Sequence, residues 1–310
     1  MNAEVFAEWL RRQGHRVYRT ASSYWYDAGP RVLQAFPYHG LITPDQKEIR
    51  DLMIRHGIIA VRYSTPLDSP AGMVSYHVVL QLPYELEKLK TQTRNGVKRG
   101  LEQFKIEQIS FERLAVDGWS LQQDTLIRQD RLRSMSQKQW ERLCRSADGL
   151  VGFEAWAATS GGELAGAVIV CRVGDVFNVP YAMSRSCCLK EHVNNALFYS
   201  VSRDLLDREG VSRIFFTVQS LDAPANVDEF KFRMGFGSIA VRQRVDFHPL
   251  IRPFASSGLH NLIHRLLQRD VSNPFLAKAD GMLHFHVEGR RPLAEQTWPE
   301  CLADQKRVNL

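Results

Sequence analysis

Two kinds of hydrophobic spacing alternate along the chain. Apolar residues at every second position predict strands, and apolar residues every three or four positions predict helices. The first half gives predicted helices at 44–56 and 84–104, and predicted strands at 16–20, 22–28, 31–36, 58–63, 73–81 and 105–113. Three strands, a helix and a strand are therefore followed, after one further strand at 73–81, by a second helix and a closing strand.

The second half repeats this order. It opens with predicted helices at 119–132 and 137–146, the second with a capping-box pair, Ser136 and Gln139. Further elements follow as strands at 151–159, 163–173 and 175–183, a helix at 193–209, a strand at 212–218, a short helix at 226–234 and a strand at 237–247. The recurrence predicts two pseudo-repeated α/β domains with mixed sheets flanked by helices.

Local signals mark the ends of the helices and the domains. Thr43 followed by Pro44 predicts a helix start with Thr43 as N-cap, and a glycine such as Gly57 predicts a helix end. A proline-containing stretch after 248 predicts a boundary. The expected domains are 1–115, 116–248 and a C-terminal helical extension at 249–310.

The extension contains one clear amphipathic helix at 258–269, GLHNLIHRLLQR. Docking of its leucine face onto the body is the simpler interpretation, and weak contact with a membrane surface is the alternative. Further on, LHFHV predicts a strand with His284 and His286 on one side. No third ligand is evident in the sequence, so we predict no metal site.

The composition is that of an ordinary globular protein with a mild excess of basic residues. The 310 residues are 44% hydrophobic and 24% charged, with a net charge of +6. This excess fits an anionic ligand or nucleic acid. The N-terminal segment lacks the apolar core of a signal peptide, no apolar run reaches the length of a membrane span, and the five cysteines are irregularly spaced. We expect a reduced, cytoplasmic protein without a disulfide framework.

The predicted helix at 84–104 carries a stripe of cations, Lys90, Arg94 and Lys98, with Arg99 beside it. A solvated face is one interpretation, and binding of an anionic substrate or a tRNA backbone through Arg94, Lys98 and Arg99 is the other. Gly96 and Gly100 are costly inside a helix, which indicates close approach of another backbone or a ligand.

Lys231 stands among apolar residues in DEFKFRMGFG at 228–237. On a helical wheel Val227, Phe230 and Met234 share a face, and Lys231 lies on its flank. A buried ammonium costs several kcal/mol unless it is paired. Lys231 therefore either extends its head into water or is held as a cation that meets developing negative charge.

A set of motifs in this region resembles the FemAB family of cell-wall aminoacyl transferases. The matching residues are Phe230, Lys231, Gly235 and Phe236, and upstream segments fit in order as VPYAMS, NNALFYSVSRDLLDREG and RIFFTV. The basic helix YELEKLKTQTRNGVKRGLEQF fits the first half of the family, so the resemblance covers about 10–248. The resemblance implies a pair of GNAT-like acyltransferase domains.

The family moves an aminoacyl group, usually from aminoacyl-tRNA, onto an amine of a cell-wall (peptidoglycan) precursor. The resemblance implies that Lys231 stabilises the tetrahedral oxyanion beside Phe230. It places Tyr181 where a side chain can bind substrate or move a proton, although a strand-end packing role is an equal alternative. Asp222 either orients the acceptor amine, pairs with Lys231 or serves as a turn residue. Here the chain departs from the family, because VQSLDAPAN lacks the usual glycine-rich turn.

A second difference from known acyltransferases bears on the identity of the acyl donor. Acetyl-CoA enzymes of this class hold the pyrophosphate with a glycine-rich loop that opens a helix. The corresponding segment SRSCCLKEHV has no glycine, and FPYHGLITP in the first half has one. This favours aminoacyl-tRNA or a carrier protein as donor, with no permanently bound cofactor. Two alternatives stay open, an N-acyltransferase that uses acyl-CoA or acyl-carrier protein to modify polysaccharide, lipid or small molecules, and an inactive RNA- or precursor-binding protein.

Overall fold

The computed structural model describes residues 3–129, 135–219, 228–270 and 273–309, and has the mixed α/β architecture expected from the sequence. Its contacts form two compact units. The first unit comprises Met1–His15, Val79–Thr217 and Asp228–Gly237, and the second comprises Arg16–Val78, Val218–Val227 and Ser238–Leu310. The units are thus built from interleaved segments, whereas the boundaries predicted at 115/116 and 248/249 divide the chain consecutively; those boundaries stay a prediction.

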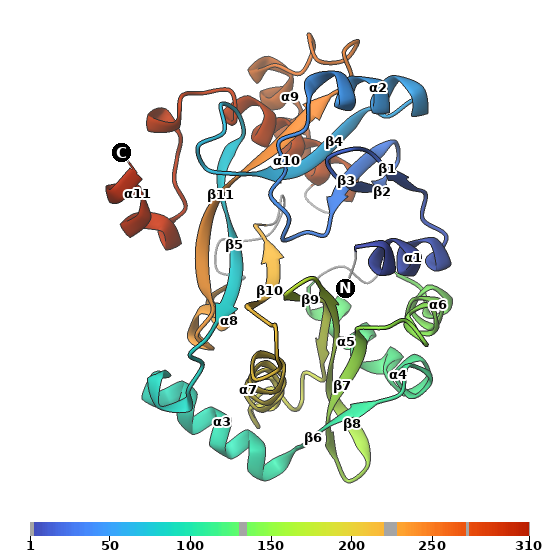
Figure 1. Cartoon of the computed structure of the whole chain (residues 1–310), viewed down its shortest axis with the longest axis vertical. Coiled ribbons are helices and arrows are strands. Elements are labelled where there is room, and N and C mark those ends of the chain that lie inside the picture. Colours follow the sequence, from blue (N-terminus) through green and yellow to red (C-terminus); the bar gives the residue numbers. More distant parts are fainter. Residues whose placement is uncertain (1–2, 130–134, 220–227, 271–272, 310) are drawn as a thin grey trace. The chain divides into compact units, whose positions relative to one another are not determined.

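The first unit has a sheet in the order β10-β9-β8-β7-β6. Strands β9 and β10 run parallel, and the remaining neighbours run antiparallel. The bounds are β6 Lys105–Ile109, β7 Phe153–Ser160, β8 Glu163–Val173, β9 Val176–Ser184 and β10 Arg213–Val218. Helix α7 lies on one face of this sheet, and α4 and α5 lie on the other (Figure 1).

Several helices of the first unit differ from prediction at their ends. The bounds are α1 Glu4–Gln13, α4 Phe111–Asp117, α5 Trp119–Arg128, α6 Gln137–Ala147, α7 Val193–Leu206 and α8 Glu229–Arg233. The predicted strand at 105–113 is too long, because Ser110 accepts a bond from the Arg113 N–H and starts α4. The capping box of Ser136 and Gln139 is confirmed.

The predicted helix at 84–104 is interrupted. It consists of a 3₁₀ turn, Leu86–Lys88, and α3, Thr91–Gln103, with extended backbone at Leu89 and Lys90. Both glycines of α3 face the start of α7. A Cβ on Gly100 would lie 2.6 Å from the carbonyl oxygen of His192, which leaves room for a hydrogen atom only. The expected close approach of another backbone is confirmed.

The second unit has a sheet in the order β1-β2-β3-β4-β11-β5. Strands β3 and β4 run parallel, and β4 and β11 run antiparallel. The bounds are β1 Val17–Arg19, β2 Tyr24–Gly29, β3 Val32–Phe36, β4 Ala60–Thr65, β5 Met73–Gln81 and β11 Gly237–Phe247.

Helix α2, Gln46–His56, packs its buried face onto this sheet. Ile49, Leu52 and Met53 join a core with Trp25 and Val61. The predicted N-cap Thr43 is wrong, because the Asp45 carboxylate accepts a bond of 2.7 Å from the Lys47 N–H two residues later along the chain. Gly57 ends the helix at a φ of 63°, as predicted.

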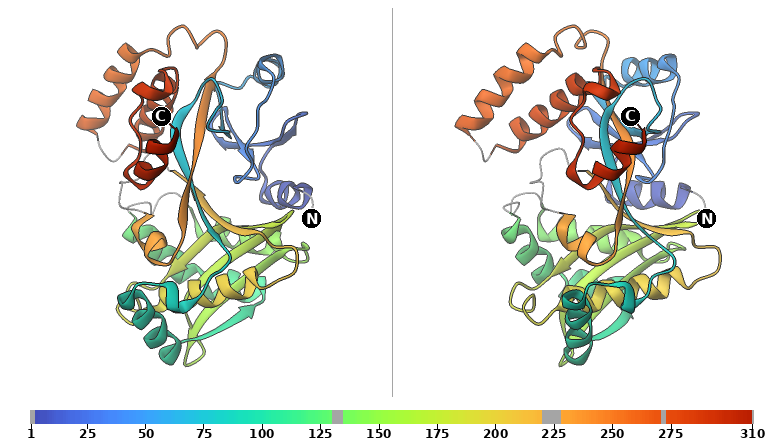
Figure 2. Two further views of the ribbon diagram at one scale, coloured as in Figure 1. Left: turned by 60° about the vertical axis from the view of Figure 1, so that its left-hand side comes forward. Right: turned by 90° about the vertical axis from the view of Figure 1, so that its left-hand side faces the viewer.

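Two adjacent helices, α9 (Ser257–Arg269) and α10 (Pro274–Glu288), follow β11 (Figure 2). Leu259 and Ile263 of α9 pack against the core that includes Leu283 and Phe285 of α10, so α9 docks on the body of its unit. The strand predicted at LHFHV is wrong. Asn273 caps α10 through bonds to the N–H groups of the first turn, and the helix runs through this segment. Short elements complete the unit at Leu293–Glu295, Glu300–Leu302 and α11, Ala303–Asn309.

The contact between α3 and α7 gives a matched pair of glycine substitutions. Gly100→Ala should lower stability by about 1–3 kcal/mol, because the added methyl group overlaps the His192 carbonyl. Gly258→Ala in α9 should be neutral or raise stability by up to about 1 kcal/mol, because the nearest atom would be 3.7 Å away. Midpoints of thermal unfolding for both variants test this. A Gly100→Ala protein as stable as the parent would contradict the packing.

Candidate functional site

Lys231 lies on the short helix α8, which ends at a glycine that no other residue can replace easily. Gly235 has a φ of 91°, in the left-handed region. A Cβ there would also lie 3.0 Å from Leu89 and 3.2 Å from the ring of Tyr84. The Tyr84 hydroxyl donates to the Met234 carbonyl at 3.0 Å. The end of α8 is therefore fixed by both conformation and packing.

The ammonium group of Lys231 is held from two sides. It forms an ion pair with Asp228, whose side chain is 2% exposed, and it lies 4.5 Å above the ring centroid of Phe216 on β10. The Lys231 side chain is itself only 15% exposed. A head group extended into water is therefore excluded. The charge sits in a partly desolvated place, where electrostatic interactions are stronger than in water.

Aromatic rings support this position. Phe216 contacts Phe198 and Phe236, with ring centroids 5.3 Å and 5.7 Å apart, and Phe230 contacts Phe198 at 5.6 Å. We call Phe198, Phe216, Asp228, Phe230, Lys231 and Phe236 the Lys231 cluster. The structure thus brings the predicted pair Phe230 and Lys231 together with Asp228, which sequence reasoning missed. The spacing of three residues between Asp228 and Lys231 was the available signal.

Tyr181 has other neighbours. Its ring lies 6.3 Å from each of Trp9 and Trp140, edge to face in both cases. It follows an irregularity in β9, where the pairing with β8 shifts between Ile169 and Cys171. Its ring contacts are therefore with α1 and α6, and a catalytic role for Tyr181 stays a prediction.

Asp222 lies in the segment 220–227, outside the residues that the structure describes. Its predicted roles, including the pairing with Lys231, stay predictions. Within the described residues, the carboxylate that pairs with Lys231 is that of Asp228.

The cations of α3 differ in their surroundings. The Arg94 guanidinium donates to the Glu87 carbonyl at 3.2 Å and to the Thr91 hydroxyl at 3.4 Å, which ties it to the helix start. Lys98 and Arg99 are exposed. Lys90 precedes the helix as its N-cap residue, so the predicted stripe is shorter than expected. Binding of substrate through Arg94, Lys98 and Arg99 stays a prediction.

A carboxylate bonds the loop between β9 and α7, where acetyl-CoA enzymes of this class hold pyrophosphate. The Ser186 N–H donates to Asp124 at 2.7 Å, and the Ser186 hydroxyl bonds the same carboxylate. Burial opposes the charge on Asp124, but the hydrogen bonds from Ser186 and the positive charges of Arg128 and Arg185 together lower the pKa of this carboxyl. A fixed negative charge on a loop N–H disfavours a phosphate there.

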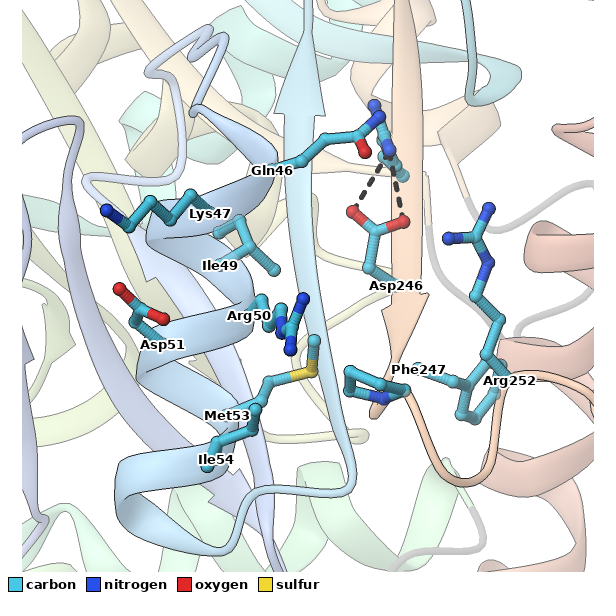
Figure 3. Close-up of a pocket in the computed structure, with 12 residues that line it drawn as sticks. Gln46, Lys47, Ile49, Arg50, Asp51, Met53, Ile54, Asp246, Phe247 and Arg252 are labelled. Atoms are coloured by element: carbon cyan, nitrogen blue, oxygen red, sulfur yellow. Dashed lines mark hydrogen bonds and ion pairs between the residues drawn. The ribbon is translucent and has the colours of Figure 1, made fainter.

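The second unit contains a pocket of about 700 Å³ between α2, β11 and the turn that follows β11 (Figure 3). Arg50 and Arg252 reach toward it from either side of Asp246, and Arg244 forms an ion pair with Asp246 at 3.0 Å. The apolar part of the lining includes Met53. Three arginines and Lys47 against the carboxylates of Asp51 and Asp246 leave an excess of positive charge in the lining, which suits a phosphate or carboxylate group.

A buried polar network joins neighbouring strands of the same unit. The Arg62 Nε donates to Gln243 at 2.9 Å, and Gln243 donates to the Ser75 hydroxyl at 3.0 Å. His77 Nε2 and the Ser64 hydroxyl are 2.9 Å apart, and both residues are buried. Because these groups bond one another, the network fixes the alignment of β4, β5 and β11.

The arginine pocket generates a test with simple anions. Titration of the protein with pyrophosphate should raise the thermal midpoint, and Arg50→Gln or Arg252→Gln should remove most of this shift, because each deletes one charge facing the pocket. Arg55→Gln is the matched control on the same helix, since Arg55 does not line this pocket. Equal shifts in all the proteins would show that the pocket does not bind anions.

No family model matches the sequence, and no curated protein is similar to it. Solved structures nevertheless share its fold. FemX has 10% sequence identity and a TM-score of 0.55, with 80% of this chain and 92% of that chain covered. L-PGS from Bacillus licheniformis has 11% identity and a TM-score of 0.52, with 79% and 91% covered.

A third structure is the C-terminal domain of a protein described as a lysylphosphatidylglycerol synthetase, from Agrobacterium fabrum. It has 10% identity and a TM-score of 0.52, with 78% of this chain and 86% of that chain covered. Among the described residues, no helix combines the length and apolar character needed to cross a membrane. At these identities the similarity concerns the fold, which the sequence motifs had indicated. The chain has the tandem GNAT-like fold of FemX and L-PGS.

Proposed function

We propose that the protein is an acyl- or aminoacyl-transferase that forms an amide on an amine acceptor. The observation that carries this proposal is the Lys231 ammonium, held by Asp228 over Phe216 and largely withdrawn from water. The proposal is supported by the sequence motif, in which Lys231 resembles the FemAB-type lysine, and by the fold that the chain shares with FemX.

The chemistry requires one cation at a fixed place. The acceptor amine attacks the carbonyl carbon of the donor ester, a C–N bond forms, and the carbonyl oxygen becomes negative. Lys231 donates a hydrogen bond to this oxyanion and stabilises it. The C–O bond to the donor then breaks, the leaving oxygen takes a proton, and the amine nitrogen loses one. An ammonium has three donors, so the bond to Asp228 leaves two for the reaction.

Asp228 has a defined part in this scheme. The nearly buried carboxylate forms an ion pair with the lysine beside it and restricts the rotamers of the lysine side chain. The fixed direction of the ammonium means that little reorganisation is needed when the oxyanion forms. Asp228 is in this proposal a positioning residue, and Lys231 is the catalytic one.

An aminoacyl ester is the proposed donor, with aminoacyl-tRNA as the first candidate. The Asp124 carboxylate of α5, which accepts a bond from Ser186 on the β9–α7 loop, argues against a CoA pyrophosphate at that place. The exposed Lys98 and Arg99 on α3 supply charge for a nucleic-acid backbone. Two neighbours carry names that refer to lysylphosphatidylglycerol or its abbreviation, and FemX is the third. We propose a cell-wall or related precursor as acceptor.

Separate incubation with aminoacyl-tRNA and acyl-CoA pools, followed by mass spectrometry of the products, tests the reaction. We expect aminoacylated amine products from the tRNA pool. Products from acyl-CoA alone would support the rival N-acyltransferase. Absence of product from both pools, together with tight RNA or precursor binding, would support a binding protein.

Substitutions at the ion pair test the role of Lys231. Lys231→Met alone removes the ammonium that pairs with the buried Asp228 carboxylate and is expected to destabilise the protein. Lys231→Met combined with Asp228→Asn removes both charges and should restore the thermal midpoint. The double variant should still lose roughly 10²–10³-fold in kcat, because the oxyanion loses its donor.

Asp228→Asn alone is the control for the positioning role. It keeps the lysine and should reduce kcat less than the double variant does. Wild-type kcat in the folded double variant would contradict a catalytic Lys231 and leave the ion pair as a purely structural contact.

A further inference from the structure

Helices α9 and α10 present histidine and carboxylate side chains to each other. On α9, His260 and His264 are four residues apart, and on α10 the same spacing separates Asp280 from His284. Residues four apart lie on one face of a helix. Because the two helices lie side by side (Figure 2), two such pairs meet across one interface.

The distances between the polar atoms are short. His260 Nε2 lies 3.3 Å from Asp280 Oδ1, and His264 Nδ1 lies 3.2 Å from the same oxygen. One ligand atom from each of the three residues falls within 4.8 Å of the others. The ring of His284 is 5.5 Å from that of His260, centroid to centroid. The side chains of His260, His264 and Asp280 therefore converge on one small volume, and the ring of His284 lies next to that of His260.

These separations match the geometry of a tetrahedral metal site. Zinc binds imidazole nitrogen and carboxylate oxygen at about 2.0–2.2 Å, so adjacent ligand atoms in a tetrahedron are about 3.3–3.5 Å apart. The observed nitrogen–oxygen distances of 3.2–3.4 Å fall close to this edge length. An ion can enter with small side-chain movements.

The site is neither fully exposed nor sealed. The side chains of His260 and Asp280 are 19% and 17% exposed, and that of His264 is 51% exposed. An ion has a path from solvent past His264. Directly beneath, Leu259 and Ile263 of α9 pack into the core of the second unit with Met282 and Leu283 of α10. The ligand backbones are thus held in place by packing.

We propose that His260, His264 and Asp280 bind a divalent transition-metal ion, with Zn²⁺ as the ion of best fit and a water molecule completing its coordination. Neutral imidazoles and one carboxylate form a ligand set that zinc favours over magnesium or calcium, which prefer oxygen. The ion would fasten α9 to α10. This site is separate from the Lys231 cluster and does not depend on the proposed acyl transfer.

His286 does not belong to the site, although it is close in sequence. Its Nδ1 bonds the Val245 carbonyl at 2.7 Å, and the residue is buried. The pair His284 and His286, considered from the sequence as a weak metal motif, is therefore divided between two environments. The relevant partner of His284 is Asp280, one helical turn earlier.

Titration of the untagged full-length protein tests the site. After treatment with EDTA and its removal, isothermal titration with ZnCl₂ at neutral pH should give one ion per chain, and metal analysis of the dialysed complex should give the same ratio. Zinc should raise the thermal midpoint, and EDTA should reverse the rise. Magnesium should give neither effect. Replacement by Co²⁺ should produce the intense visible absorption of a four-coordinate ion.

Variants separate the site from general surface binding. Asp280→Asn and His264→Gln should each weaken zinc binding at least 10- to 100-fold while the apo protein keeps its fold. His56→Gln, which alters an exposed histidine on α2, is the matched control and should bind as the parent does. Equal zinc affinity in all these proteins, or no saturable binding by the parent, would overturn the proposal and leave a histidine–aspartate hydrogen-bonded cluster.

Discussion

The ion pair between Asp228 and Lys231 sets the chemistry of the candidate site. The Asp228 side chain is 2% exposed, and an ion pair with Lys231 offsets part of the cost of burying its carboxylate. The lysine is in turn restrained by Phe216 beneath it and by the short helix α8, which Asp228 precedes as N-cap residue. Removing either partner takes away this compensation, so the pair acts as one unit.

The surrounding elements make this unit rigid. Gly235 adopts the left-handed conformation that ends α8. Because it has no side chain, Leu89 and Tyr84 can pack against its backbone. Gly100 likewise allows α3 to approach the backbone of α7 closely. Phe198 of α7 contacts both Phe216 and Phe230. A path of close backbone contacts therefore runs from α3 through α7 to the aromatic rings that support the lysine. Larger residues at the two glycines would disturb the site from outside it.

Much of this fold follows from local sequence, and the errors are informative. The α2 helix, its end at Gly57 and the capping box of Ser136 were predictable because each depends on neighbours along the chain. LHFHV was mistaken for a strand because its alternating aromatic and histidine residues mimic strand periodicity. The helix start that decides the matter, capped by Asn273, lies ten residues before that window, and the packing of Leu283 into the core depends on residues distant in the chain.

Some residues of the candidate sites could also be recognised from local sequence, and others could not. Lys231 and Phe230 could be found because a charged residue beside an apolar stripe is visible in one helical turn. The contact of Asp124 with the β9–α7 loop could not be found in this way, because Asp124 lies on α5, 62 positions before Ser186. The pocket around Asp246 joins α2 to β11, and the histidine cluster joins α9 to α10. Contacts between distant segments need the fold before they can be recognised.

Lys231 and the exposed cations differ in their dielectric surroundings, and this difference affects how salt should act on binding and on the chemical step. Lys231 is partly buried and paired, so added salt screens it little. Arg50, Arg252, Lys98 and Arg99 are exposed, and their attraction for an anion falls steeply as salt rises. Salt should therefore raise KM for an anionic donor or acceptor bound by the exposed cations, while kcat at saturation, which reflects Lys231, should change little. A chemical step as sensitive to salt as substrate binding would instead place the exposed arginines or lysines at the reacting atoms.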